Sequence, residues 1–231
     1  MKMADHRFNL TETPIIADQI LRNYKRDKSY FEHFSPKFDH EFLVKFEEKV
    51  DTLAHLTPLQ VLKNEIAKKD ENIKIIINHF RPLLNITEAL LQRVATAQNL
   101  PVANSGLNEL RESLNRGNTG EIQKNCRNMI SKLELRIDEL IDKGFILRIL
   151  NDFHLLTVKL KNAESELADV THQYNMNTDK YLMIDNQLED FVEPIIESIH
   201  VVFGENDADK KEEYAIAKLM THAQFMRSES H

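Results

Sequence analysis

The residues of this chain best suited to metal chemistry are two carboxylate–histidine pairs, Glu197 with His200 and Asp169 with His172. Residues three positions apart lie on one face of a helix, so each pair could supply two ligands to a metal ion. Helical bundles hold di-metal centres with such pairs on two helices and a Glu on each of two others. Here both pairs fall on one predicted helix and face away from its apolar stripe. We therefore predict surface residues, with no metal or other cofactor.

Cys126 and the Gly117–Gly120 segment also have a chemical and a structural interpretation. Cys126 could be a nucleophile, but it lies on the apolar stripe of its helix, where a free cysteine packs as a small hydrophobe. The two glycines could cradle a phosphate, but no strand precedes them and no Gly-Lys-Ser/Thr motif follows. We interpret Cys126 as a core residue and the glycines as a connection between helices, and we expect no catalytic residue.

Two charged groups near the N-terminus could bind ions. A basic group could contact phosphates, but acidic residues lie among its members, which favours a solvated helix face. A His-rich group could bind a cation at a break between helices. The basic group is Arg22, Lys25, Arg26 and Lys28, and the His-rich group is Glu32, His33, Asp39 and His40.

Acidic residues gather between positions 164 and 197, which contain nine Asp or Glu and one basic residue, Lys180. A solvated outer face of a helix explains this pattern, and so does a docking surface, because a stripe of one sign steers association with a cationic partner. Either a Lys-bearing helix over 58–98 neutralises the stripe or an external partner does. The candidate partner-binding residues are spaced four apart: Asp185, Glu189, Glu193 and Glu197.

The longest element that must position these residues is predicted by apolar periodicity. From Phe153 to Val202 apolar residues recur at alternating intervals of three and four, interrupted by Asn177 and Ser198. This is the pattern of a coiled-coil seam. The pattern keeps its register across Asn177, which favours one helix over 146–203, about 87 Å long, rather than a hairpin near Asn177. Pro194 should bend this helix without ending it.

A second stripe predicts a helix over 58–98 that continues through Pro82, and Gly144 should end a helix in the left-handed conformation. We predict an all-α fold: an elongated antiparallel helical bundle of the four-helix up-down type, with long coiled-coil-like helices. Residues 1–231 would form a single domain. Its four passes would be 14–56, 58–98, 104–143 and 145–203, followed by a C-terminal helix over 209–227.

Composition limits the class of protein. The 231 residues are 42% hydrophobic and 29% charged, with five Gly, six Pro and one Cys. These values argue against disorder, an all-β fold, a disulfide scaffold and a multi-Cys zinc site. The formal net charge of −7 argues against general nucleic-acid binding. We see no signal peptide and no stretch apolar enough to span a bilayer, so we expect a cytoplasmic protein without an integral membrane segment.

Three functions remain open. The first is a non-enzymatic interaction or structural protein, an adaptor or assembly component that binds a protein partner or itself through long helical surfaces. The second is a soluble helical protein of the pore-forming type, which oligomerises and inserts into membranes; leakage from liposomes would identify it. The third is a di-metal carboxylate enzyme, which elemental analysis of the purified protein would identify. The absence of a convergent catalytic constellation favours the first.

Overall fold

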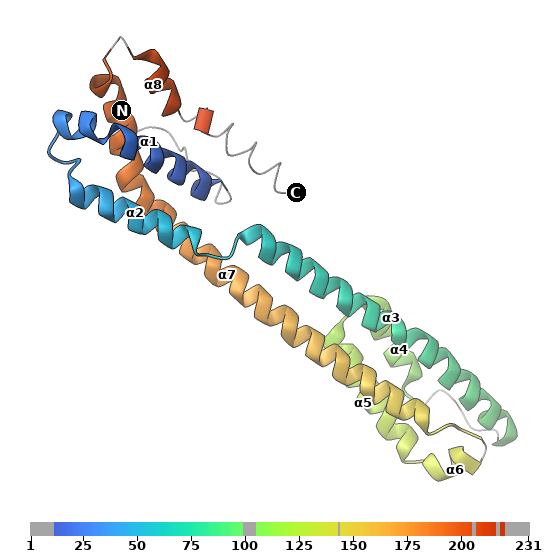
Figure 1. Ribbon diagram of the computed structural model, residues 1–231. Coiled ribbons are helices and arrows are strands. Elements are labelled where there is room, and N and C mark those ends of the chain that lie inside the picture. The colour runs from blue at the N-terminus through green and yellow to red at the C-terminus, as the bar shows by residue number, and fades with distance from the viewer. Residues whose placement is uncertain (1–11, 99–104, 143, 205–206, 216–217, 220–231) are drawn as a thin grey trace. The chain divides into compact units, whose positions relative to one another are not determined.

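The computed structural model describes residues 12–98, 105–142, 144–204, 207–215 and 218–219. Within those ranges the chain forms eight helices and no strand, which confirms the predicted all-α fold (Figure 1). None of these helices is both long and apolar enough to cross a membrane. In chain order they are α1 (Thr13–Phe34), α2 (His40–Ala54), α3 (Leu59–Gln98), α4 (Leu107–Arg116), α5 (Thr119–Glu134), α6 (Ile137–Asp142), α7 (Arg148–Val202) and α8 (Ala208–Glu213).

The longest helix, α7, is continuous over 55 residues. It passes through Asn177 without a turn, so the prediction of one helix is confirmed and the alternative of a hairpin is wrong. Pro194 also lies inside the helix, where it removes one backbone hydrogen bond. Because Val192 and Ile195 on either side of it are buried, packing of the apolar face stabilises the helix across this position.

The chain divides into two compact units, each with its own apolar core. Unit 1 comprises residues 1–62 and 173–231, and unit 2 comprises residues 63–172. Both long helices contribute to both units, because α7 spans the division after residue 172 and α3 spans the division after residue 62. The grouping of residues 1–231 as one domain stays a prediction.

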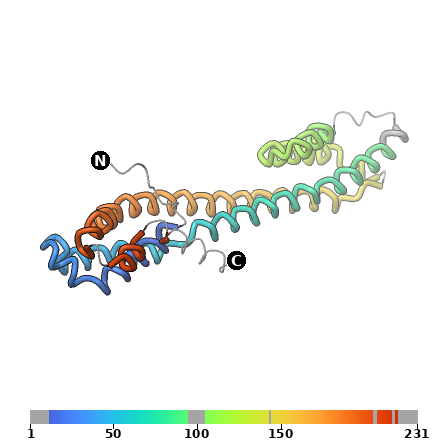
Figure 2. Tube along the Cα trace, turned by 90° about the horizontal axis from the view of Figure 1, so that it is seen from above, coloured from blue at the N-terminus to red at the C-terminus, as the bar shows by residue number. Residues whose placement is uncertain are grey.

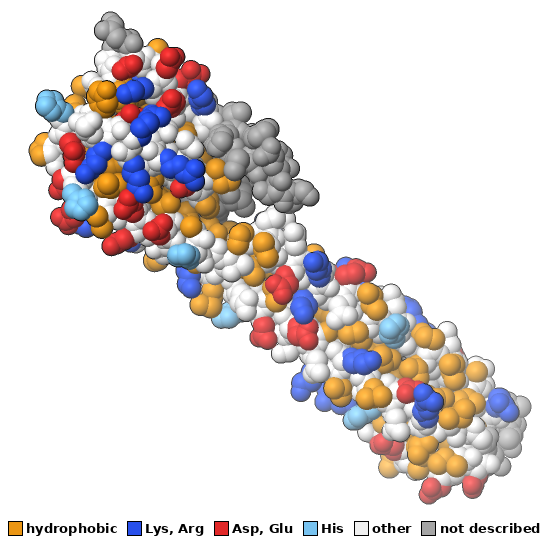
Figure 3. All heavy atoms as spheres, in the orientation of Figure 1, with side chains coloured by type: hydrophobic (Ala, Val, Ile, Leu, Met, Phe, Trp, Pro, Cys, Tyr) orange, Lys and Arg blue, Asp and Glu red, His pale blue; other side chains and the backbone are white. Residues whose placement is uncertain are grey.

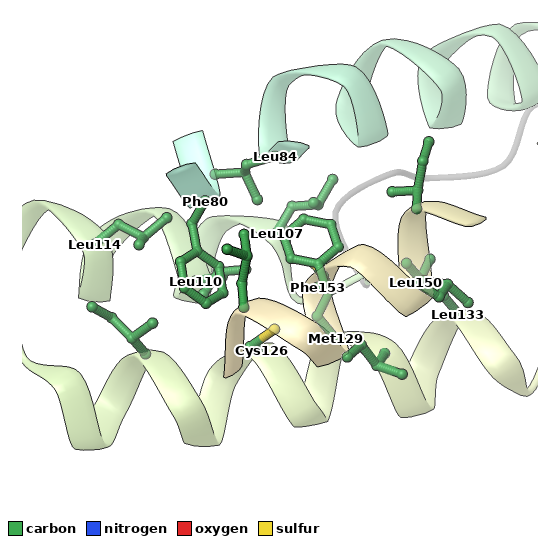
Figure 4. Close-up of a cluster of buried hydrophobic side chains, with 14 of the residues drawn as sticks. Phe80, Leu84, Leu107, Leu110, Leu114, Cys126, Met129, Leu133, Leu150 and Phe153 are labelled. Atoms are coloured by element: carbon green, nitrogen blue, oxygen red, sulfur yellow. The ribbon is translucent and has the colours of Figure 1, made fainter. Parts of the chain in front are cut away.

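Unit 2 is a bundle of α3, α4, α5 and the N-terminal part of α7 around one core. Phe80 from α3 and Phe153 from α7 are fully buried, with ring centroids 6.2 Å apart. Leu110 from α4 and Cys126 from α5 are also fully buried, and Figure 4 shows their side chains in the same cluster. The apolar stripes of four helices therefore meet in this core, as helical periodicity predicts.

A tight connection joins α4 to α5, and Figure 2 shows the two helices side by side. Helix α4 ends at Arg116, and the next residue, Gly117, has a φ of +67°, in the left-handed region that glycine adopts readily. The Asn118 side chain then accepts a 3.0 Å hydrogen bond from the Glu121 backbone N–H and caps α5. The interpretation of the glycine segment as a connection between helices is confirmed.

Unit 1 contains α1, α2, α8 and the C-terminal half of α7. The ring of Tyr24 in α1 is fully buried and lies 5.5 Å from the ring of Phe42 in α2. Its hydroxyl donates a 3.2 Å hydrogen bond to the Phe38 carbonyl. In α2, Phe46 stacks on Phe191 of α7 with centroids 5.4 Å apart. Aromatic contacts therefore bind the two N-terminal helices to each other and to α7.

Two of the predicted passes consist of several helices. Segment 14–56 contains α1 and α2, which pack against each other, and segment 104–143 contains α4, α5 and α6. The sequence indicates a break near Ser35 and Pro36 and another at Gly117–Gly120. Each helix buries one face in the core of its unit, so the apolar stripe continues after each break and does not reveal that the chain reverses there. The end of α6 follows the prediction: Gly144 has a φ of +87°, and the Phe145 N–H donates a 2.8 Å hydrogen bond to the Leu140 carbonyl.

The predicted C-terminal helix over 209–227 stays a prediction, because more than half of it lies outside the described residues. Helix α8 ends at Glu213, residues 218–219 are helical again, and residues 216–217 and 220–227 lie outside the described residues. The backbone N–H groups of Tyr214 and Ala215 bond to carbonyls three residues earlier, which tightens the last turn and ends the helix. Tyr214, the first residue after α8, is fully buried, and its ring packs against Phe31 and Phe203.

Asn177, the amide in the long seam, bonds to a distant carbonyl. Its Nδ2 donates a 3.2 Å hydrogen bond to the backbone oxygen of Thr57, between α2 and α3. We expect Asn177→Leu to lower the free energy of unfolding by about 1 kcal/mol, because the hydrogen bond is lost and the half-exposed position offers little apolar burial. Thermal unfolding checks this, with Asn175→Leu, an exposed position on the same helix, as the control. A higher melting temperature for Asn177→Leu alone would indicate a buried register position instead.

Candidate interaction surface

The C-terminal half of α7 positions the four acidic residues that the sequence indicates. A step of four residues exceeds one helical turn, so each successive carboxylate is rotated by about 40° around the helix axis. Glu189, Glu193 and Glu197 are exposed, as expected for an outer face. They lie on successive turns of one helix, and we call them the acidic face.

Asp185, the first of the four, does not belong to this face. It is 8% exposed, and its Oδ1 accepts a 2.8 Å hydrogen bond from the Thr13 hydroxyl at the start of α1. The rotation explains the difference, since Asp185 lies about 120° from Glu197 around the axis and beside the buried Ile184 and Leu188. The prediction that Asp185 lies on the outer face of the helix is therefore wrong, and its carboxylate binds α1 to α7.

Large apolar side chains accompany the acidic face. Leu182, Met183 and Val201 of the same helix half are 42%, 55% and 66% exposed. Asp190 and His200 are exposed as well. Aliphatic side chains among carboxylates are suited to protein contacts, because the apolar atoms contribute burial and the charges contribute orientation.

Within the described part of the chain, no ion pair involves Glu189, Glu193 or Glu197. The sequence left open whether the Lys-bearing helix α3 neutralises the acidic stripe. In unit 2 one ion pair of this kind is present, in which Lys69 Nζ lies 2.7 Å from Glu166 Oε2. The acidic face of unit 1 has no such ion pair among the described residues.

The basic group of α1 is paired internally. Arg22 lies 2.6 Å from Asp18, Lys25 lies 2.7 Å from Glu47, and Lys28 lies 3.0 Å from Glu32. Arg26 pairs with Asp27 and Glu213. Figure 3 shows basic and acidic side chains intermingled on the visible face of unit 1. This arrangement supports the interpretation of these residues as a solvated, salt-bridged surface.

The metal-ligand candidates are distributed over the surface. Glu197, His200, Asp169 and His172 are all exposed, as expected for surface residues. No three His, Cys, Asp or Glu side chains of the described residues are placed to share a metal ion. In the His-rich group, Asp39 caps α2 by accepting a 2.8 Å hydrogen bond from the Phe42 N–H.

Cys126 is a buried core residue, which confirms its structural interpretation. Burial raises the pKa of its thiol to about 11, while a 3.3 Å hydrogen bond from the Thr157 hydroxyl opposes the shift. A thiol of this pKa carries little thiolate at neutral pH, so it is a poor nucleophile.

Sequence reasoning missed a polar cluster between α1 and α8. Asp27 is 2% exposed, and its carboxylate meets Arg26 Nη2 at 2.5 Å, the Tyr214 hydroxyl at 3.2 Å and Lys210 Nζ at 3.5 Å. A signal was present: Asp27 occupies the three-four spacing between the buried Tyr24 and Phe31 of α1, where an apolar residue is expected. A polar residue at such a position indicates a buried partner.

The charges of this cluster support one another. Burial alone would raise the pKa of the Asp27 carboxyl, but hydrogen bonds and charge from Arg26, the charge of Lys210 and a hydrogen bond from Tyr214 lower it below its ordinary value. Burial, together with the negative charge of Asp27, raises the pKa of Tyr214. Asp27 is therefore ionised at neutral pH and Tyr214 is a neutral donor to it.

No protein-family model, no curated protein and no solved structure matches this chain. The residues and their geometry are therefore the basis on which a function can be proposed.

Proposed function

We propose that this chain is a helical interaction protein, without catalytic activity of its own, which binds a cationic protein partner through the outer face of α7 in unit 1. The observation that carries the proposal is the acidic face: Glu189, Glu193 and Glu197 are exposed on successive turns and have no ion pair among the described residues. Like charges at this spacing repel one another by a few tenths of a kcal/mol per pair. A basic partner would relieve that repulsion.

The neighbouring side chains support a protein partner rather than a simple counterion. Leu182, Met183 and Val201 expose apolar surface on the same half of α7. Interfaces combine an apolar centre with charges that steer encounter and fix orientation. A partner helix or loop with basic residues beside aliphatic ones would match this arrangement.

The test is a pair of substitutions, Glu189→Gln with Glu193→Gln. We expect the melting temperature to stay unchanged or to rise slightly, because the substitutions relieve repulsion and break no internal ion pair of the described residues. We expect partner capture by the full chain to weaken, and the loss to shrink as salt is raised, because exposed charges are screened within about 10 Å at 0.1 M ionic strength. Affinity capture over a salt series, with the bound proteins quantified, measures the loss of binding and its dependence on salt.

The matched control is Glu48→Gln with Asp51→Asn, which removes two exposed carboxylates from α2 of the same unit. It should capture the same partners as the unsubstituted chain. If both double variants lose the same partners to the same extent, net charge rather than the acidic face determines binding. A marked loss of stability in the Glu189 and Glu193 variant would instead show that these carboxylates are neutralised internally.

A further inference from the structure

We propose that α8 is a displaceable strap, which occupies within its own chain a docking surface for a helical protein segment with a basic residue four positions before a tyrosine. This surface is separate from the acidic face, and the proposal does not depend on the function of that face. We call it the strap surface. Its residues are Asn23, Arg26, Asp27, Tyr30 and Phe31 of α1, with Phe203 at the end of α7.

The strap surface binds the basic residue of α8 by charge and by an aromatic ring. Lys210 Nζ lies 3.5 Å from Asp27 Oδ1 and 4.1 Å from the centroid of the Tyr30 ring. The Phe203 ring is also near, at 5.3 Å. A carboxylate together with aromatic faces is a favourable site for an ammonium group. Recognition of a basic residue is therefore built into α1.

The tyrosine after α8 completes the contact. Tyr214 is fully buried, its ring lies 5.9 Å from both Phe31 and Phe203, and its hydroxyl is 3.2 Å from Asp27 Oδ2. Lys210 and Tyr214 are four residues apart, which places both on one face of a helical turn. The Asp27 carboxylate therefore contacts both Lys210 and Tyr214.

Backbone and acidic contacts set the orientation of the strap. Asn23 Nδ2 donates a 3.1 Å hydrogen bond to the Glu213 carbonyl, and Arg26 Nη2 lies 2.6 Å from Glu213 Oε2. These two contacts of Glu213 specify the direction in which the segment docks, in addition to the anchor residues Lys210 and Tyr214.

The anchors of the strap are the contacts of Lys210, Glu213 and Tyr214. Helix α8 has six residues, and none of the six is buried. A helix of this length is not stable by itself in water, so its structure depends on the docked contacts. Tyr214 and Leu219, which follow α8, are the buried residues that the structure describes in this segment. Because α8 itself contributes no buried residue, it should open at lower free energy than the core. Release would leave Asp27 beside Arg26 and next to exposed aromatic rings, ready for a segment of the same pattern.

The test uses a fluorescent peptide with the sequence of residues 207–219 as the probe and the full chain as the receptor. In Lys210→Ala with Tyr214→Ala the internal strap is weakened while the strap surface is unchanged. We expect this variant to bind the peptide at least 10-fold more tightly than the unsubstituted chain, because its weakened strap competes less for the surface. Adding Asp27→Asn to that variant should weaken binding at least 10-fold. Anisotropy titration measures all three affinities.

Two controls make the result specific. Asp18→Asn, which removes a half-exposed partner of Arg22 on the same helix, should leave peptide binding unchanged. A peptide with the basic and tyrosine positions exchanged should not bind. Equal binding by the unsubstituted chain and the strap variant, or no effect of Asp27→Asn, would overturn the proposal.

Hydrogen exchange on the unsubstituted chain tests release without any substitution. Amides of α8 should exchange at least 10-fold faster than the buried turns of α1 and of α7 in unit 1, because only the strap opens. Equal protection of α8 and α1 would show that the two helices unfold together, which contradicts a displaceable strap.

Discussion

Replacing Phe153 with alanine is expected to lower the free energy of unfolding of unit 2 by about 3–5 kcal/mol. The side chain is fully buried and packs against Phe80 in the cluster of Figure 4. Truncation removes apolar contacts and leaves a cavity that the surrounding helices fill only in part. Denaturant unfolding measures the loss, and hydrogen exchange should place it in α4 and α5, whose buried residues share this core.

The control for this prediction is Leu155→Ala, two residues along the same helix. Leu155 is 60% exposed, so its truncation should change the free energy of unfolding by no more than about 0.5 kcal/mol. A comparable loss from both substitutions would mean that the buried face of α7 in unit 2 is assigned to the wrong side.

Pro82→Ala is expected to have a large effect of opposite sign, raising the free energy of unfolding by about 2 kcal/mol. Pro82 lies inside α3 with its side chain exposed. A proline in a helix interior costs about 3 kcal/mol relative to alanine, because it removes a hydrogen bond and clashes with the preceding turn. Part of this gain is offset, because the unfolded chain has greater freedom without the rigid ring. That freedom lowers the free energy of unfolding by up to about 1 kcal/mol. Chemical and thermal unfolding both measure the net gain.

Pro58→Ala tests whether position in the helix causes that gain. Pro58 is exposed and precedes α3, and its carbonyl accepts the first backbone bonds of that helix. Proline suits this end of a helix, so alanine there should bring no stabilisation. An equal gain at both positions would point to the unfolded chain or to a general property of proline rather than to strain in α3.

Local features of the sequence were enough to predict the two longest helices, α3 and α7. The stripe from Phe153 to Val202 predicts α7 because a helix repeats every 3.6 residues, and this periodicity depends only on neighbouring residues. Gly117 and Gly144 mark helix ends for a similarly local reason, since each adopts a positive φ. The exposure of Glu189, Glu193 and Glu197 follows from the same helical pattern.

Contacts between distant segments decided the rest. An apolar stripe shows that a face is buried but does not identify its partner, so the packing of α1 on α2 and of α4 on α5 was not visible. Asp185 is buried because Thr13, 172 positions away, donates a hydrogen bond to it. Asp27 bonds to Tyr214 across 187 positions. Ionic and polar groups of this kind are stable in a core only when folding brings their partners to them. A local sequence pattern does not identify those partners, because they lie far away along the chain.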